Sequence, residues 1–375
     1  LLITLLLSGL IVFSTYATSN KSDVKLTKNI TKSFLVGAKP EVDVSNKYGK
    51  VIVTGWDKDS VKISVDIVAY GKNSETVEKM IAKVDVDFMH NAGYLAVETQ
   101  MNRRRGNFGG LISDLEGYGK TFLNSNKLTI DYTIYVPKAT VFSLENKFGD
   151  VFLDKLYGTI DLDLSHGDLK ARELQGKANI QLSYGNGRIK TMKEGFIKLK
   201  GGEIDVQEGD EIDVESSSSE LIFGDIKSLL ISSRNDKIRA GSVRVLKGTG
   251  DFTDIFVSEV NNELDINMEY GELYVERIGE DFSSILINSK AADINLVISP
   301  ESYFSANISG SEDRMIIPNS MLSLGKKNTK DSDYDFTLSG EVGPTRSTKG
   351  KVAIKSMNAD LIISIKETGI FTRKD

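Results

Sequence analysis

Residues 146–169 read N-K-F-G-D-V-F-L-D-K-L-Y-G-T-I-D-L-D-L-S-H-G-D-L, which is one complete repeat unit and the start of the next. Gly149 opens the first unit and Gly167 opens the second, about 18 residues later. Inside the unit, apolar and polar residues alternate with the period of a half-buried β-strand. The stretch therefore predicts short strands separated by turns at the glycines.

The unit recurs along the middle of the chain with a period of about 17–18 residues. Later units open at Gly185, Gly202, Ser219, Asp236, Thr253, Gly271 and Ala292. One unit cannot bury its own apolar face, so successive units are expected to stack with their strands about 4.8 Å apart. Equivalent apolar residues then form columns, one of which is Leu153, Ala171, Ile189, Val206, Phe223, Ala240, Val257, Val275 and Leu296.

This pattern predicts an all-β fold, and specifically a single-chain β-solenoid (β-helix-like) with coils of about 17–18 residues. The opening glycine is expected at a corner, where a left-handed or otherwise tight conformation is cheap only for glycine. An antiparallel sandwich or barrel is the alternative, because it also contains regular short strands. We rank it second, since neighbouring units resemble one another and do not pair as mirror-image hairpins.

The pattern divides the chain into four segments. They are a signal peptide at residues 1–19, an N-terminal β region at 20–140, the solenoid repeats at 141–300, and a C-terminal β region at 301–375 that closes the solenoid. The N-terminal region is expected to contain one short helix near residues 73–84, capped by Ser74, and a long mobile loop at residues 101–126.

The first 13 residues are apolar and are followed by small residues, as in the hydrophobic and cleavage regions of a secretory signal peptide. A membrane anchor is the alternative, but a spanning helix needs about 20 apolar residues, more than this run contains. We therefore expect an exported protein of the periplasm, the outer cell surface or the extracellular space. After removal of the signal peptide, no integral membrane span is expected.

Composition excludes several classes of function. A net charge of -6 and a pI near 5.3 argue against nucleic-acid binding, which relies on basic surfaces. The chain contains no cysteine, which removes disulfides and thiol catalysis. Its two histidines, His90 and His166, are far apart in the sequence, so a metal cluster or a histidine-based triad lacks the necessary residues. No catalytic residue, cofactor or metal ligand is predicted.

Three surface features have both a functional and a structural interpretation. Arg103, Arg104 and Arg105 could form a patch for anionic glycans or lipid headgroups, although a solvated loop tip is the favoured interpretation. An acidic residue often follows the opening position, which suggests either a weak calcium column or, preferably, solvated turns. Those acidic residues are Asp150, Asp168, Glu203, Glu220, Asp254, Glu272 and Asp293.

An aromatic residue or histidine often precedes the opening position, at Tyr48, Phe148, His166, Tyr184 and Tyr270. Such a series could be a ladder on which sugars stack. The favoured interpretation is that these rings pack over the corner glycines.

Five motifs have the order and spacing seen in a family of exported bacterial proteins. They are NKYGKVIVTGWD (46–57), YVPK (135–138), NKFGDV (146–151), SHGDL (165–169) and NADLIISI (358–365). Over residues 40–365 the chain resembles the "putative adhesin" family, a domain of unknown function with an adhesin-like β-solenoid fold. The resemblance implies export and a solenoid, and it implies no catalytic residue.

The leading hypothesis is therefore a non-enzymatic, exported β-solenoid of the cell envelope, an adhesin or interaction scaffold whose partners are envelope proteins or glycans. A carbohydrate-active enzyme, a polysaccharide lyase or hydrolase on a β-helix, is the second hypothesis, because acidic residues are plentiful. A calcium-stabilised structural protein is the third. The outward-facing residues of the repeats are chemically mixed, which disfavours a focused catalytic patch.

Overall fold

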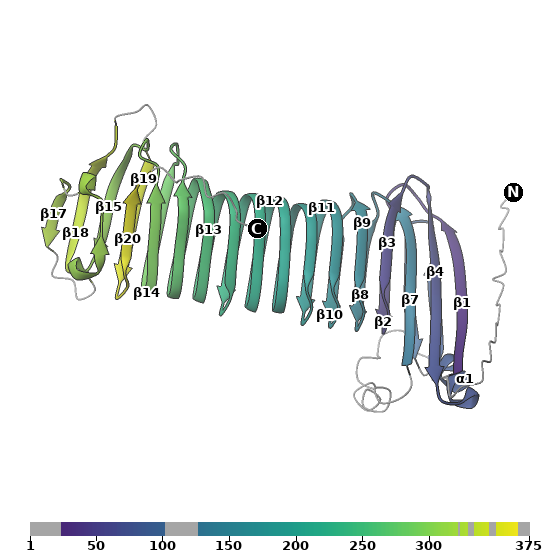
Figure 1. The fold of residues 1–375 in the computed structure, drawn as a ribbon. Helices are drawn as coiled ribbons and strands as arrows, with labels where there is room; N and C mark the ends of the chain where they lie inside the picture. Colours follow the sequence, from purple (N-terminus) through teal and green to yellow (C-terminus); the bar gives the residue numbers. More distant parts are fainter. Residues whose placement is uncertain (1–23, 102–126, 322, 329–333, 345–349, 367–375) are drawn as a thin grey trace. The chain divides into compact units, whose positions relative to one another are not determined.

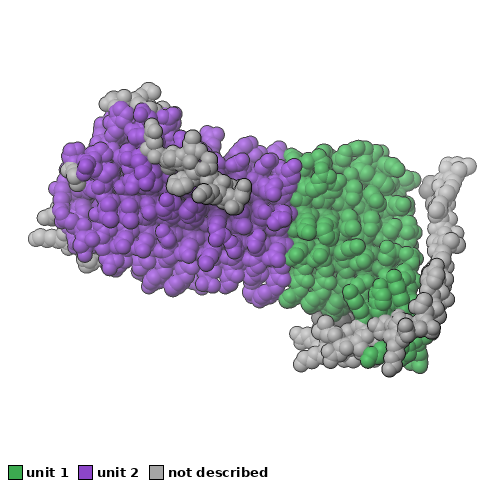
Figure 2. Space-filling view, viewed as in Figure 1, with its two compact units in different colours: residues 1–177 green, residues 178–375 purple. Residues whose placement is uncertain are grey.

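The computed structural model describes residues 24–101, 127–321, 323–328, 334–344 and 350–366. Strands dominate these ranges and form a large, mostly parallel sheet that does not close on itself (Figure 1). The predicted all-β class is confirmed. The chain comprises two compact units, residues 1–177 and residues 178–375, coloured separately in Figure 2.

Unit 1 contains two ladders of strands. The first has the order β1 (Val24–Leu35), β4 (Ser60–Gly71), β7 (Lys127–Pro137), β3 (Val51–Trp56), β9 (Val151–Leu156) and β11 (Leu169–Ser183), whose first residues pair with β9. The pairs β1–β4 and β4–β7 are antiparallel, and the remaining pairs are parallel.

The second ladder has the order β5 (Val84–His90), β6 (Tyr94–Met101), β2 (Glu41–Lys47), β8 (Val141–Lys147) and β10 (Ile160–Ser165). Only β5–β6 is antiparallel in this ladder. Since β2 leads into β3 and β8 leads into β9, each of these segments gives one strand to each ladder, with a corner between the two strands.

The alternating pattern buries every second residue. In β8, Phe142 and Leu144 are buried, and in β9 Val151 and Leu153 are buried, while their neighbours face outward. Burying a side chain of this size stabilises the fold by about 1.5–3 kcal/mol. The core of unit 1 is therefore built from the apolar columns that the sequence pattern predicts.

The register of the strands follows the aligned repeats. Val151 pairs with Leu169 and Leu153 pairs with Ala171, as the alignment of the two units predicts. Val51 pairs with Val151, although strands β4 to β8 lie between the two valines in the sequence. The earlier copy of the motif therefore lies directly beside the later one.

The left-handed corner residue is the one before the opening glycine. Of the two predicted alternatives, a left-handed or an otherwise tight conformation, Gly49, Gly149 and Gly167 do not take the left-handed one. The left-handed residues are Tyr48, Phe148, His166, Tyr184, Gly201, Ser218, Asn235, Phe252, Tyr270, Ala291 and Asn358, with φ between 50° and 66°. Most are types that seldom adopt positive φ. Strand pairing on both sides of the corner imposes the conformation.

The opening glycine is needed for a different reason. A Cβ atom on Gly149 would lie 1.9 Å from the carbonyl oxygen of Gly49, and one on Gly167 would lie 2.2 Å from that of Gly149. Two backbones therefore approach too closely at this corner for any side chain. The glycine pattern marks close stacking of adjacent strands.

Unit 2 contains β12 (Gly187–Arg234), β13 (Lys237–Ile278), β14 (Ser284–Ile298), β15 (Phe304–Gly310), β16 (Met315–Ile316), β17 (Gly325–Asn328), β18 (Phe336–Val342), β19 (Gly350–Met357) and β20 (Leu361–Ile365). The long strands β12 and β13 turn corners at their left-handed residues. The pairs β12–β13, β13–β14, β14–β19, β14–β20, β15–β19 and β16–β20 are parallel. The pairs β15–β18 and β17–β18 are antiparallel.

The predicted helix is α1 (Ser74–Ala82), which buries Val77, Met80 and Ile81. Its N-cap is Asn73, whose side chain accepts a hydrogen bond from Thr76 N at 2.8 Å, so the expected cap at Ser74 is one residue late. Asparagine is among the strongest N-cap residues. Within the described ranges, no helix has the length and apolar character needed to cross a membrane.

Candidate functional site

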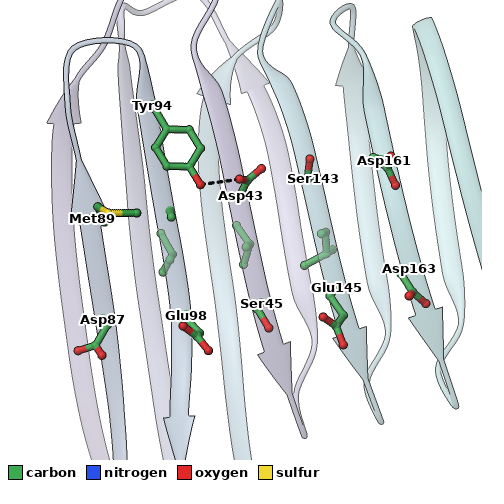
Figure 3. A pocket seen from close by; sticks show the side chains of 14 residues that line it. Asp43, Ser45, Asp87, Met89, Tyr94, Glu98, Ser143, Glu145, Asp161 and Asp163 are labelled. Atoms are coloured by element: carbon green, nitrogen blue, oxygen red, sulfur yellow. Dashed lines mark hydrogen bonds between the residues drawn. The ribbon is translucent and has the colours of Figure 1, made fainter. Parts of the chain in front are cut away.

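A shallow groove of about 400 Å³ lies on the outer face of the second ladder of unit 1 (Figure 3). We call it the unit 1 groove. Strands β5, β6, β2, β8 and β10 contribute its side chains. The outward-facing ones are Asp43, Ser45, Asp87, Met89, Tyr94, Ala96, Glu98, Ser143, Glu145, Asp161 and Asp163.

Strand alternation and register bring these side chains together. On β2, Val42 and Val44 point into the core, so Asp43 and Ser45 point outward. The register then places Ser45 between Glu98 of β6 and Glu145 of β8. Asp87 lies opposite Glu98, and Asp163 lies opposite Glu145. The result is one polar row across five strands.

Electrostatic repulsion in the groove is only partly relieved. Six of its side chains are carboxylates, namely Asp43, Asp87, Glu98, Glu145, Asp161 and Asp163. Like charges directly opposite each other in a sheet are destabilising. Lys147 offsets part of this repulsion, because its Nζ lies 2.6 Å from Glu145 Oε1. Partial burial, together with the charge of Lys147, lowers the pKa of Lys47.

Tyr94 and Asp43 form the best-defined contact in the groove. The Tyr94 hydroxyl donates a hydrogen bond to Asp43 Oδ2 at 2.7 Å. This bond raises the pKa of Tyr94 to about 12, because a phenolate could not donate it and would be repelled by the carboxylate. Tyr94 therefore stays a neutral donor at physiological pH, and it fixes the orientation of Asp43.

The groove can offer hydrogen-bond acceptors and a negative potential to a ligand. It is open to solvent, and its carboxylates are spread along strands instead of converging on one point. Among the described residues, no group of three or more His, Cys, Asp or Glu side chains is placed to hold a metal ion. The geometry is that of a contact surface.

Of the surface features predicted from the sequence, the acidic residues are described by the structure and the arginine patch is not. Arg103, Arg104 and Arg105 lie outside the described residues, as do residues 1–23 and 102–126, which contain the predicted signal peptide and most of the predicted loop. The acidic residues that follow the opening positions make different contacts: Glu220 forms an ion pair with Arg239, whereas two others accept hydrogen bonds from the backbone. Asp150 Oδ1 accepts a hydrogen bond from Asp168 N at 3.0 Å, and Asp293 Oδ1 accepts one from Asp360 N at 2.9 Å.

The aromatic series of unit 1 forms a stack. The rings of Tyr48 and Phe148 are 5.5 Å apart, those of Phe148 and His166 are 5.0 Å apart, and both pairs are nearly parallel. Lys47 Nζ lies 5.0 Å from the centre of the Tyr48 ring. Because the Phe148 ring has an aromatic neighbour on each side, it presents its edge to a ligand and has no free face for sugar stacking.

Sequence reasoning missed the unit 1 groove. The groove depends on β6 lying beside β2, and nothing in the local sequence specifies that pairing. A usable signal was present in the outward positions of the strands. Asp85 and Asp87 alternate with valines, and Asp161 and Asp163 alternate with leucines, so two acidic strand faces could have been recognised.

Comparisons with known proteins give structural likenesses only. No protein-family model and no curated protein matches the chain. A crystal structure described as a putative cell adhesion protein from Clostridium sporogenes is 10% identical, with a TM-score of 0.20, and the match covers 90% of this chain and 100% of that one.

Two further solved structures are similar to the chain. A crystal structure described as a putative lipid binding protein from Parabacteroides distasonis is 12% identical, with a TM-score of 0.29, and the match covers 89% of this chain and 96% of that one. A crystal structure described as a putative adhesin from Parabacteroides merdae is 11% identical, with a TM-score of 0.36, and the match covers 71% of this chain and 95% of that one. The resemblance to adhesins stated from the sequence motifs thus recurs among the solved structures to which this chain is similar.

Proposed function

We propose that the protein is an exported β-solenoid of the cell envelope that acts as a non-enzymatic adhesin or interaction scaffold. The observation that carries the proposal is the in-register parallel pairing of successive segments. Val151 pairs with Leu169 in unit 1, and Leu221 pairs with Ile238 in unit 2. Such pairing supports the proposal that each segment is a coil that contacts mainly its neighbours.

The outward side chains of such a stack form straight rows on a rigid framework. Hydrogen-bonded strands hold neighbouring rows about 4.8 Å apart. Ion pairs link the rows across strands, as between Arg172 and Asp154 at 2.8 Å and between Lys198 and Glu215 at 2.8 Å. A rigid, patterned surface suits recognition of an extended partner, and envelope proteins or glycans are the partners that we propose.

Export rests on the sequence of residues 1–19, which has the apolar run and small residues of a signal peptide. The absence of cysteine is compatible with an oxidising compartment, because no thiol is available for unwanted disulfides. The periplasm, the outer cell surface and the extracellular space are the proposed locations.

One observation favours a second function, a glycoside hydrolase. Glu145 and Asp163 lie opposite each other on neighbouring parallel strands, which are about 4.8 Å apart. Retaining glycosidases separate their two carboxyl groups by about 5–5.5 Å. We rank this function second, because Lys147 is ion-paired with Glu145 and the groove is open.

Localisation combined with binding tests the proposal. In cells of the source organism, an antibody against unit 2 should detect the mature protein in the envelope or culture fluid. Purified mature protein should sediment with isolated envelopes. Recovery of the mature protein solely from the cytosol would refute the proposal. Hydrolysis of any member of a polysaccharide panel, abolished by Glu145→Gln, would replace it with the second function.

A further inference from the structure

Unit 2 has aromatic stacks at Phe252–Tyr270 and at Phe256–Tyr274, and the first of them, at the left-handed corner, ends at Tyr270. Phe252 and Tyr270 occupy the same corner on successive segments, and their rings stack 4.6 Å apart at an interplanar angle of 11°. Both rings are exposed, at 58% and 41%. The next corner residue is Ala291, because Gly271 pairs with Ala292. One face of the Tyr270 ring is covered by Phe252, while the other points toward a position that holds only a methyl group.

A second groove, of about 490 Å³, adjoins this corner. We call it the unit 2 groove. Asn267 and Glu269, the residues that lead into Tyr270, line it together with Asn288 and Lys290 of β14. The register places Asn267 opposite Asn288 and Glu269 opposite Lys290. The end of the aromatic stack thus lies at the rim of a polar groove.

The amides in the unit 2 groove retain hydrogen-bonding capacity. Asn288 Nδ2 donates to Asn267 Oδ1 at 2.8 Å, and both side chains are exposed. An amide has two donor hydrogens and an oxygen with two lone pairs, so one bond uses a small part of this capacity. Lys355 of β19 lies opposite Asn288 and extends the row. The row offers hydrogen-bond donors and acceptors to a ligand that lies across it.

The charged residues of the unit 2 groove balance one another. Lys290 Nζ lies 2.6 Å from Glu269 Oε1, and Asp251 accepts a hydrogen bond from Arg234 at 2.8 Å. Asp251, Glu269, Lys290 and Lys355 sum to zero formal charge. In this respect the groove differs from the acidic unit 1 groove. Electrostatics therefore favours neither an anionic nor a cationic ligand here.

We infer that the unit 2 groove and the uncovered face of Tyr270 bind a neutral oligosaccharide. A pyranose ring has an apolar C–H face and a rim of hydroxyls. Its apolar face stacks on Tyr270 above Ala291, in the place of the missing aromatic ring. The hydroxyls of the adjoining sugar contact Asn267 and Asn288. The inference rests on the proposed function, since it names the glycan that the scaffold recognises.

Calorimetric titration of the full mature protein tests the inference. Cellotetraose and chitotetraose are the neutral probes, and tetragalacturonate is the anionic probe of similar length. At least one neutral probe should bind, and tetragalacturonate should not. Tyr270→Ala should weaken binding by about tenfold or more. Binding of tetragalacturonate alone, or of no probe, would overturn the inference.

Tyr184→Ala is the matched control. Tyr184 is also a left-handed corner tyrosine of unit 2 and is 55% exposed. The residues that line the unit 2 groove, however, come from segments that begin at Thr249, so Tyr184 is not beside it, and Lys200 Nζ lies 5.9 Å from the Tyr184 ring centre. Tyr184→Ala should leave the affinity unchanged. An equal loss in both variants would show that the effect is not local to the groove and would overturn the inference.

Ala291→Phe gives a sharper test, because it fills the gap in the stack. Phenylalanine is accepted at this left-handed corner, as Phe148 and Phe252 show with φ of 59° and 50°. The new ring should cover Tyr270, abolish oligosaccharide binding and leave the melting temperature unchanged or higher. A folded Ala291→Phe protein that binds as well as the wild type would overturn the inference.

The two proposals can fail separately. If no oligosaccharide binds but the mature protein still sediments with envelopes, the sugar site is wrong and the envelope scaffold stands. If a neutral oligosaccharide binds but the mature protein is found only in the cytosol, the site is right and the envelope function is wrong.

Discussion

Asn46 and Asn146, 100 positions apart in the sequence, are hydrogen-bonded to each other inside unit 1, with Asn46 Nδ2 donating to Asn146 Oδ1 at 3.1 Å. Asn146 Nδ2 also donates to the carbonyl oxygens of Gly49 at 3.2 Å and Gly149 at 2.8 Å. Both asparagines are buried. Their amides therefore satisfy backbone oxygens that close stacking at the corner removes from water.

Replacing Asn146 with leucine should lower the free energy of unfolding by about 1–3 kcal/mol, because one buried and one partly buried carbonyl oxygen lose a donor. Leucine suits the site in size, since Leu164 holds the same register position on β10. Urea denaturation measures the change. The control is Asn261→Leu, an exposed residue bonded to Ser242, which should stay within about 0.5 kcal/mol of the wild type. Equal stability of Asn146→Leu and the control would contradict the role of the amide.

Gly149→Ala should destabilise unit 1 by about 3 kcal/mol or more, since its Cβ would lie 1.9 Å from a backbone oxygen that cannot move independently. Gly93→Ala is the matched control, because a Cβ there meets no atom within 4 Å. That variant should stay within about 1 kcal/mol of the wild type. Thermal unfolding of both proteins measures the difference, and a tolerated Gly149→Ala would rule out the close stacking at this corner.

The ring of Tyr94 should titrate near pH 12 in the folded protein, because its hydrogen bond to Asp43 favours the neutral phenol. The folded pKa is raised above the unfolded value of 10.0, so the stability that this contact contributes is complete below pH 10 and is lost as the pH rises toward 12. An NMR titration with labelled tyrosine follows the ring directly. Asp43→Asn should move the pKa of Tyr94 back toward 10.0, and a wild-type value already near 10.0 would exclude the contact.

Millimolar calcium should leave the melting temperature of the mature protein unchanged. Asp150 and Asp293 of the acidic column each accept a hydrogen bond from the backbone of the next strand, which occupies one carboxylate oxygen. Calcium binds through six to eight oxygen ligands, more than these separated turns bring together. Calorimetric scans with calcium and with a chelator make the comparison. A rise in melting temperature that the chelator reverses would restore the calcium hypothesis.

Much of the fold follows from the sequence because successive segments pair in parallel with nearly the same offset each time. Leu153 and Ala171 have equivalent positions in the repeat, and they pair in the structure for that reason. The reason for the corner glycines was less accessible. A regular spacing of glycines looks the same whether the backbone needs a positive φ or room for a close neighbouring strand. In the structure, Phe148 is the residue with positive φ, and Gly149 is the residue at which the neighbouring backbone leaves no room for a Cβ atom.

The grooves were harder to predict than the core. A buried position such as Val44 is recognisable from alternation alone, whereas Tyr94 meets Asp43 only because β6 pairs with β2 across a 51-residue separation. In the same way, the uncovered face of Tyr270 depends on the identity of Ala291 in the next segment. Outward contacts are set by which strands are neighbours, and a single strand does not encode its neighbour.

The connection between β13 and β14 indicates where this fold can change length. Asn267 and Asn288 are 21 positions apart, whereas Arg234 and Asp251 are 17 apart, and both pairs span adjacent segments. The additional residues lie between Ile278 and Ser284. Residues 263–275 of β13 pair with residues 284–296 of β14 without a shift, and one register shift falls between Val275 and Ile278. For protein engineering, the exposed residues Glu280 and Asp281 of this connection mark an insertion site: a foreign peptide placed between them would leave the buried Phe282 and the paired residues of both strands in place.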